Sequence, residues 1–272
     1  MKIFVVKHKN ITLLAGLLAA CAIFYAVSYP SAVGAYATDR QLPIYCVEKD
    51  QKVCSISFDA AWGNEDTQTL IDILEQYKVK ATFFVVGQWV DKYPESVKAL
   101  SDAGHEVMNH SATHAHYNQL SADEITADVN TCNDKVEAVT GVRPTLIRCP
   151  YGEYDDHVVS AIRSIGMEPI QWDVDSLDWK EIPASEITQR VTSKVQPGSI
   201  VLFHNAAKHT PEALPSILEN LISQGYTIVP ISQLIIKGQC GTDYTIDHTG
   251  KQLAIQAAPE GSASSAGSSA KQ

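Results

Sequence analysis

The stretch Cys54-Ser-Ile-Ser-Phe-Asp59 is a short apolar run that ends in an acidic residue, and the same design recurs along the chain. The runs are mostly β-branched or aromatic and are bounded by glycine, proline or charged residues, as strands usually are. The predicted strands are Cys54–Phe58, Ala81–Val86, Glu106–Asn109, Thr145–Cys149, Pro169–Val174, Ser199–Phe203 and Thr227–Pro230.

Amphipathic segments lie between these strands. Thr67–Tyr77 places Leu70, Leu74 and Tyr77 on one helical face. Ser121 and Glu124 form a capping-box pattern at the start of a longer segment, Ser121–Val139. The remaining predicted helices are Pro94–Ala103, Asp155–Ile165, Pro183–Lys194 and Pro211–Gln224. Alternating strands and helices predict an α/β fold with a parallel sheet, either an open sheet or a closed barrel.

Ionisable residues lie at or just beyond the carboxyl ends of most predicted strands, namely Asp59, His110, Arg148, Asp175 and His204. Barrels and open α/β sheets both build their active sites at this end. Singly, each residue has an ordinary explanation, such as a helix cap for Asp59 or a core position for His204. Their joint placement predicts one catalytic site.

Five ordered motifs resemble those of polysaccharide deacetylases with NodB homology, carbohydrate esterase family 4. They are Ser57-Phe-Asp59, His110-Ser-Ala-Thr-His114, Arg148-Cys-Pro-Tyr-Gly152, Asp175-Ser-Leu-Asp-Trp179 and Leu202-Phe-His204. The resemblance spans about Lys52 to Ile235 and implies a distorted (β/α)7 TIM-like barrel. The version Phe58-Asp-Ala-Ala-Trp-Gly63, together with the N-terminal apolar segment, is most similar to the sporulation-associated PdaB-type branch.

This resemblance implies a hydrolase that removes N-acetyl groups from peptidoglycan or a related N-acetylglucosamine polymer. Asp59 would be the general base, with Arg148 keeping it ionised. His204, oriented by Asp175, would protonate the departing amine.

The remaining roles implied by the family concern the metal and the substrate. His110 and His114, four residues apart, would hold a divalent metal, zinc or a similar ion. The backbone N–H near Tyr151 would stabilise the oxyanion, and Trp179 and Leu202 would wall the acetyl pocket.

Two positions depart from the family pattern. Ala60 stands where family members usually carry a second aspartate that completes the metal ligands. Asn64, Glu65 or Asp66 could fold back to replace it, and we predict Asp66. Cys149 stands where proline is typical, but nothing else in the sequence supports a Cys–His nucleophile.

Two other functions stay open. The same chemistry would let the protein act as an O-acetyl carbohydrate esterase. Alternatively, Ala60 is consistent with a non-catalytic glycan-binding or spore-envelope protein that has lost its metal.

The N-terminus has the character of an export segment. Lys2, Lys7 and Lys9 precede an uncharged stretch at 10–38, which predicts a signal anchor or signal peptide at 1–37. About twenty apolar residues can span a bilayer, and flanking lysines stay in the cytoplasm. We therefore expect an extracytoplasmic protein anchored to the bacterial cell membrane, or a secreted one after cleavage at Ala35-Tyr-Ala37; a lipoprotein box at Leu18–Cys21 is the weakest alternative.

The rest of the chain is expected to comprise a linker at 38–51, the deacetylase domain at 52–236 and a mostly disordered C-terminal extension at 237–272. The net charge of −10 disfavours nucleic acid as a partner, and we expect a monomer. The six cysteines include no C-x-x-C pair, which gives no support to a zinc-ribbon or thioredoxin site. A Cys46–Cys54 disulfide is possible in an exported protein.

Overall fold

The computed structural model describes residues 40–255, of which residues 41–255 belong to one compact unit. The predicted signal segment at 1–37 lies outside the described residues. Within residues 40–255, no helix combines the length and the apolar character required to cross a membrane.

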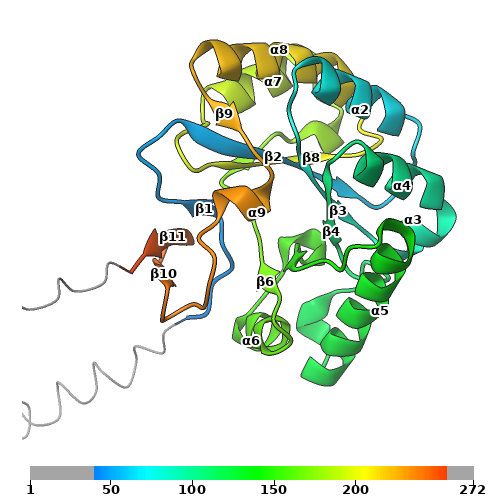
Figure 1. Cartoon of the computed structure of the whole chain (residues 1–272), viewed down its shortest axis with the longest axis vertical. Helices are drawn as coiled ribbons and strands as arrows, with labels where there is room; N and C mark the ends of the chain where they lie inside the picture. The colour runs from blue at the N-terminus through cyan, green and yellow to red at the C-terminus, as the bar shows by residue number, and fades with distance from the viewer. Residues whose placement is uncertain (1–39, 256–272) are drawn as a thin grey trace, which may run out of the picture. The chain divides into compact units, whose positions relative to one another are not determined.

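A curled sheet with parallel pairings throughout forms the centre of this unit (Figure 1). Its spatial order is β6-β5-β4-β3-β2-β8-β7, and β9 pairs with the start of β2. The strands are β2 (Val53–Ala60), β3 (Thr82–Val85), β4 (Glu106–Asn109), β5 (Leu146–Ile147), β6 (Glu168–Pro169), β7 (Val174–Asp175), β8 (Ile200–His204) and β9 (Thr227–Ile228). The sheet and its helices form a distorted (β/α)7 barrel, which confirms the predicted fold.

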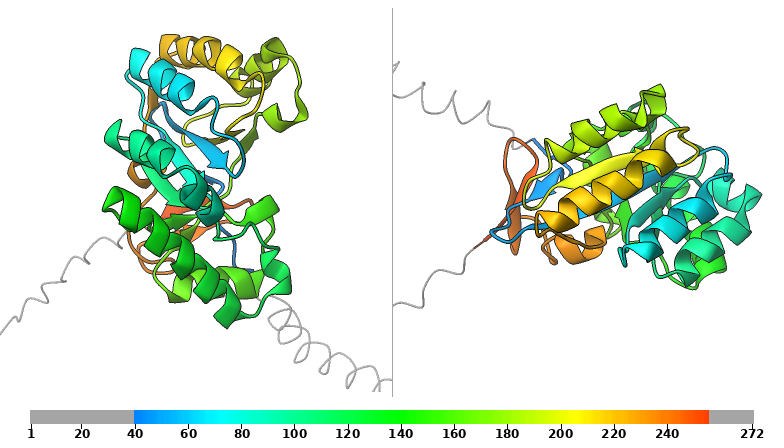
Figure 2. Two further views of the ribbon diagram at one scale, coloured as in Figure 1. Left: turned by 90° about the vertical axis from the view of Figure 1, so that its right-hand side faces the viewer. Right: turned by 90° about the horizontal axis from the view of Figure 1, so that it is seen from above.

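Helices surround this sheet, and α7 and α8 pack side by side on one flank (Figure 2). The helices are α2 (Thr67–Gln76), α3 (Gly87–Lys92), α4 (Pro94–Asp102), α5 (Ala122–Thr140), α6 (Asp156–Ser164), α7 (Ala184–Thr192), α8 (Thr210–Ser223) and α9 (Ile231–Leu234). Single 3-10 turns lie at Tyr117–Gln119, Pro150–Gly152 and Asp178–Lys180. The predicted helices are confirmed, and α5 begins with the predicted capping box of Ser121 and Glu124.

The central strand β2 shows how the sequence positions the site. Its alternate residues Ile56, Phe58 and Ala60 join the apolar cluster beneath the outer helices. Phe58 stacks between Phe83, at 4.7 Å, and Phe203, at 5.5 Å, on the two flanking strands. The intervening side chains therefore face the barrel interior, and the last of them is Asp59.

One predicted strand is wrong. Pro169–Val174 is divided between β6 and β7, which lie at opposite edges of the sheet. β6 ends at Pro169, and the chain joins β8 at Asp173, whose N–H donates to the Ile200 carbonyl and whose carboxylate accepts hydrogen bonds from Ser199 Oγ and the Ile200 N–H. An apolar run does not reveal such a break, because Ser199 and Ile200, which hold the second part of the segment, are distant in the sequence.

Parts of the predicted linker at 38–51 and of the predicted extension at 237–272 form strands, whereas the stretch at 256–272, predicted to be disordered, lies outside the described residues. β1 (Cys46–Val47) pairs with β11 (Lys251–Ala254), and β11 pairs with β10 (Tyr244–Ile246). Ile44 bonds with Pro169 and Gln171, beside β6. The Val47 N–H donates to the Gly198 carbonyl just before β8. The segment 44–47 thus closes the gap between the two sides of the barrel. The strands β1, β10 and β11 have only 2, 3 and 4 residues, too few to give a clear sequence pattern.

The cysteines of residues 40–255 are all free thiols. Cys46 and Cys54 are both buried but do not form the possible disulfide. Burial raises the pKa of Cys46 to about 11 and that of Cys54 to about 12, so both stay protonated at neutral pH.

Candidate active site

A hollow of about 500 Å³ opens at the carboxyl ends of the strands. It is lined by Asp59, Trp62, His110, His114, Tyr151, Gly152, Trp172, Asp175, Trp179, Leu202 and His204. Asp59 and His204 are direct neighbours in the β2–β8 register, so their side chains share one end of the barrel. The structure thus brings most of the predicted site residues to a single hollow.

Asp59 is held by a buried ion pair. The Arg148 Nη1 donates to Asp59 Oδ1 at 2.7 Å, and neither side chain is more than 7% exposed. Arg148 also donates to the Gln171 carbonyl at 3.1 Å and lies over the Phe84 ring. Burial alone would raise the pKa of Asp59, but the charge and hydrogen bond of Arg148, together with His110 and His204, outweigh burial, and the net pKa lies below its ordinary value. Asp59 is therefore a carboxylate at neutral pH.

His110 presents one ring nitrogen to this carboxylate. Its Nδ1 lies 2.7 Å from the Arg148 carbonyl oxygen, which only accepts hydrogen bonds, so Nδ1 carries the proton. The lone pair of Nε2 then faces the hollow, 3.6 Å from Asp59 Oδ2. Burial lowers the pKa of His110, which keeps the ring neutral.

His114 lies beside His110 in a tight loop, with the ring centroids 5.0 Å apart. The loop is fixed by two side chains: Asn109 Oδ1 accepts from the Ser111 N–H, and Ser111 Oγ accepts from the His114 N–H, both at 2.7 Å. Burial, then the neighbouring His110, lowers the pKa of His114 to about 4. Both imidazoles are thus neutral, the form that binds a metal.

A third metal ligand is not brought to these histidines. Among residues 40–255, no cluster of three or more His, Cys, Asp or Glu side chains is placed to hold an ion. Ala60 is buried in the apolar cluster beneath the helices. Asp66 lines a different hollow, and its Oδ2 accepts from the Ala206 N–H at 2.9 Å. The described residues therefore do not fit a three-ligand zinc site, and Asp66 as a ligand stays a prediction that this placement does not support.

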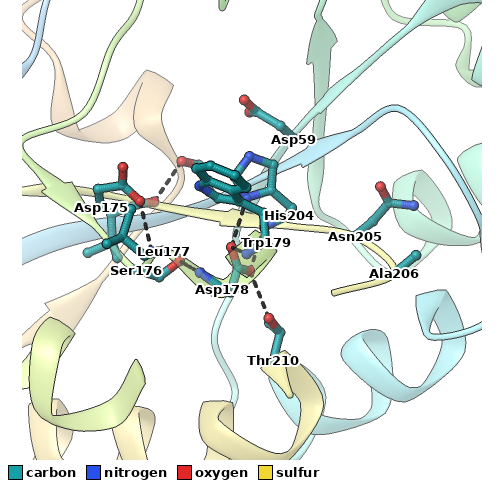
Figure 3. Close-up of polar contacts among 12 residues, drawn as sticks. Asp59, Asp175, Ser176, Leu177, Asp178, Trp179, His204, Asn205, Ala206 and Thr210 are labelled. Atoms are coloured by element: carbon teal, nitrogen blue, oxygen red, sulfur yellow. Dashed lines mark hydrogen bonds and ion pairs between the residues drawn. The ribbon is translucent and has the colours of Figure 1, made fainter. Parts of the chain in front are cut away.

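His204 is oriented by Asp178, not by the predicted Asp175 (Figure 3). The fully buried Asp178 accepts from His204 Nδ1 at 2.8 Å and from Thr210 Oγ1 at 2.7 Å. Asp175 lines the hollow, but its carboxylate turns back to accept from the Leu177 N–H at 2.8 Å. The Asp175 carboxylate therefore bonds within its own turn, and the His204 ring is bonded by Asp178 instead.

The acid–base state of His204 follows from this contact. Burial would lower the pKa of His204, but the hydrogen bond and charge of Asp178 outweigh it, with further help from Asp59 and Asp175. The net pKa lies above its ordinary value. With Nδ1 bonded to Asp178, Nε2 is left to act on a substrate.

Aromatic and apolar side chains form the walls of the hollow. Tyr151 and Trp179 are 56% and 53% exposed at the surface, whereas Leu202 is buried. Tyr151 has a left-handed φ of 59°, and the centroid of its ring lies 4.4 Å from that of the His114 ring. Sequence reasoning missed Trp62 and Trp172, because lone tryptophans in a loop and beside a strand carry no spacing signal.

Cys149 does not take part in the site. Its thiol is buried in the apolar cluster around Val129 and Ile162, and burial raises its pKa to about 12. A protonated, buried thiol is not a nucleophile, which agrees with the sequence-based rejection of a Cys–His site.

The chain is similar to several known proteins. Residues 47–170 match the sequence model of a family described as polysaccharide deacetylase. Peptidoglycan-N-acetylmuramic acid deacetylase PdaC of Bacillus subtilis is 37% identical over 188 residues, which are 69% of this chain and 40% of PdaC. Peptidoglycan-N-acetylglucosamine deacetylase PgdA of Listeria monocytogenes is 36% identical over 197 residues, 72% of this chain and 42% of PgdA.

A solved structure is also similar. A carbohydrate esterase family 4 pseudoenzyme from Bacillus anthracis is 38% identical, with a TM-score of 0.68, over 71% of this chain and 68% of that one. A mutant of the same protein, described as having restored enzymatic activity, gives a TM-score of 0.69. The chain thus spans less than half of the length of the two curated deacetylases but about two thirds of the pseudoenzyme.

Proposed function

The chain belongs to the polysaccharide deacetylase family, carbohydrate esterase family 4, and on this basis we propose that it removes N-acetyl groups from cell-wall glycan. The supporting observation is the pairing of Asp59 and His204 across one hollow. The pKa of Asp59 is held below its ordinary value and that of His204 above it. Two groups whose pKa values are driven apart are suited to act as base and acid.

The proposed reaction uses both groups in turn. Ionised Asp59 accepts a proton from a water molecule. The oxygen of that water attacks the acetamide carbonyl carbon, and a tetrahedral intermediate forms. Protonated His204 then donates its Nε2 proton to the amide nitrogen, the C–N bond breaks, and acetate and the free amine leave. Asp178 holds the imidazole in place throughout, because it bonds Nδ1. The N–H near Tyr151 remains the proposed oxyanion donor.

A divalent ion, zinc or a similar one, is part of the family chemistry, and His110 and His114 are the side chains that would hold it here. Two neutral imidazoles meet part of that requirement. A catalytic zinc ion usually has three protein ligands. We therefore expect zinc to bind this protein more weakly than it binds a complete three-ligand site.

A second candidate is a non-catalytic glycan-binding protein. Two observations favour it: Ala60 supplies no ligand, and the fold resembles that of a family pseudoenzyme. This candidate predicts glycan binding without acetate release and without retained metal.

Acetate release from N-acetylglucosamine oligomers and from peptidoglycan separates the two candidates. The purified chain is assayed with added zinc, with chelator, and as Asp59→Asn. Metal-dependent release that Asp59→Asn abolishes supports the deacetylase. Glycan binding without release under any condition supports the non-catalytic protein. An acetyl ester substrate in the same assay tests the O-acetyl esterase alternative.

The finer assignment is a PdaB-type enzyme that acts on peptidoglycan during sporulation, held at the outer face of the membrane by its N-terminal segment. It is supported by the Phe58–Gly63 sequence and by the apolar stretch at 10–38. Digestion of intact cells with an external protease tests the location: a protected protein would contradict it.

A further inference from the structure

Trp62 has no role in the proposed reaction, yet it occupies a central position. Its ring stacks on the His204 imidazole, with centroids 6.0 Å apart and planes 16° from parallel. Even so, 48% of the residue is exposed. A large aromatic face left open beside a reactive group is suited to bind a ligand.

The backbone on both sides of Trp62 is fixed in place. Asn205, which is only 2% exposed, accepts from the Ala61 N–H and donates to the carbonyls of Trp62 and Gly63. Trp89 Nε1 donates to the same Gly63 carbonyl. Because these bonds fix the loop before any ligand arrives, ordering the loop would not weaken ligand binding.

Gly63 is a backbone requirement of this loop. Its φ is +51°, and an added Cβ would lie 2.7 Å from the Ala206 Cβ. The chain can therefore turn here only with glycine, which keeps Trp62 next to β8.

Trp62 also borders a second hollow, of about 520 Å³. That hollow is lined, besides Trp62, by Gly63, Glu65, Asp66, Thr69, Ala206, Ala207, Lys208 and Pro211. Glu65 and Lys208 are exposed there. Because Trp62 lines both hollows, it lies between the acid–base pair and this second space.

We infer that Trp62 is a stacking platform for a sugar ring next to the one that reacts, and that the second hollow receives the continuing glycan strand. A pyranose ring has C–H faces that fit an indole and hydroxyl edges that fit groups such as Glu65 and Lys208. Tyr151 and Trp179 line only the first hollow. The inference rests on the proposed glycan substrate and adds that a polymer longer than the reacting unit is recognised.

The test is the dependence of affinity on glycan length. Binding of single N-acetylglucosamine and of its five-unit oligomer is measured by calorimetry, with Asp59→Asn in every variant so that no acetate is released. Trp62→Ala is expected to weaken binding of the five-unit oligomer by about tenfold and of the single sugar, which has no neighbouring ring, much less. Trp62→Phe, which keeps a ring, should retain most of the affinity.

Ile222→Ala is the matched control, because Ile222 is an exposed apolar residue on α8 and 42% accessible. It should leave binding of the single sugar and of the five-unit oligomer unchanged. Equal affinity in Trp62→Ala and the parent, or an equal loss at both lengths, would overturn the inference. Acetate release from the five-unit oligomer is then measured with Asp59 intact. If the protein releases acetate and Trp62→Ala does not alter the rate, the platform is overturned and the deacetylase stands. If binding depends on glycan length but no acetate is released, the platform stands and the deacetylase is overturned.

Discussion

Replacing Arg148 with methionine tests whether the ion pair with Asp59 is the main support of the site. The Nη1–Oδ1 distance is 2.7 Å and Arg148 is fully buried. Two unit charges about 4 Å apart attract by about 4 kcal/mol at an effective dielectric constant of about 20. Removing one partner of a buried pair leaves the other charge uncompensated, which typically destabilises a protein by about 3–5 kcal/mol. Arg148→Met should therefore lower the free energy of unfolding at pH 7 by about 3–5 kcal/mol.

Urea denaturation of a double-mutant cycle measures this effect. The variants are Arg148→Met, Asp59→Asn and the two combined. The combined variant should be more stable than Arg148→Met alone, because the amide that replaces the Asp59 carboxylate carries no charge that needs a partner. The pKa of Asp59 is lowered in the folded state, so the stabilisation is present above the unfolded-state pKa and is lost as the pH falls through the lower, folded-state pKa.

Two results would refute this reasoning. One is a stability change below about 0.5 kcal/mol in Arg148→Met, the size of an ordinary surface substitution. The other is strict additivity in the cycle, which would show that Arg148 acts through packing on Phe84 and not through its charge.

Three further predictions concern the acid, the metal and the fold. Asp178→Asn should lower the pKa of His204 and move the alkaline loss of kcat to lower pH; a pH–rate profile measures this, and an equal shift in Asp175→Asn would contradict the assignment. Ala60→Asp should increase the zinc retained after dialysis, measured by metal analysis, because it offers a third ligand. A lower Tm with no gain in zinc would contradict this and would mean that the carboxylate stays among the apolar side chains beneath the helices. Ser121→Ala should cost about 1 kcal/mol and lower Tm by about 2–4 °C in a thermal scan, with an unchanged Tm excluding the cap as a stabilising contact.

Most strands and helices were predictable because their signals are local, whereas the choice of a closed barrel over an open sheet came from the resemblance of the five motifs to a known family. An apolar run such as Cys54–Phe58 and a capping pair such as Ser121 and Glu124 carry their structure within a few residues. The break after Pro169 was not predictable, because Ser199 and Ile200, which bind Asp173, lie 26 and 27 residues away.

The site was predictable to the same extent. Strand ends and motif order predicted that Asp59, Arg148 and His204 would meet, and they do. The choice between Asp175 and Asp178 depended on the direction of one turn, which spacing does not encode. Trp62 was missed because its position depends on the hydrogen bonds of Asn205, a partner 143 residues away.

The closure of the barrel by residues 44–47 bears on how this domain can be excised and transplanted. A cassette cut at the motif-bearing core, from Lys52 onward, would remove the hydrogen-bonding partners of Pro169 and Gly198. It would also uncover Ile170 and Ile200, which pack with Ile44. Exposed apolar strand edges pair with other chains, so such a cassette should aggregate on expression. A transplantable unit therefore starts no later than Leu42 and runs through Ala254, well outside the five motifs that identify it.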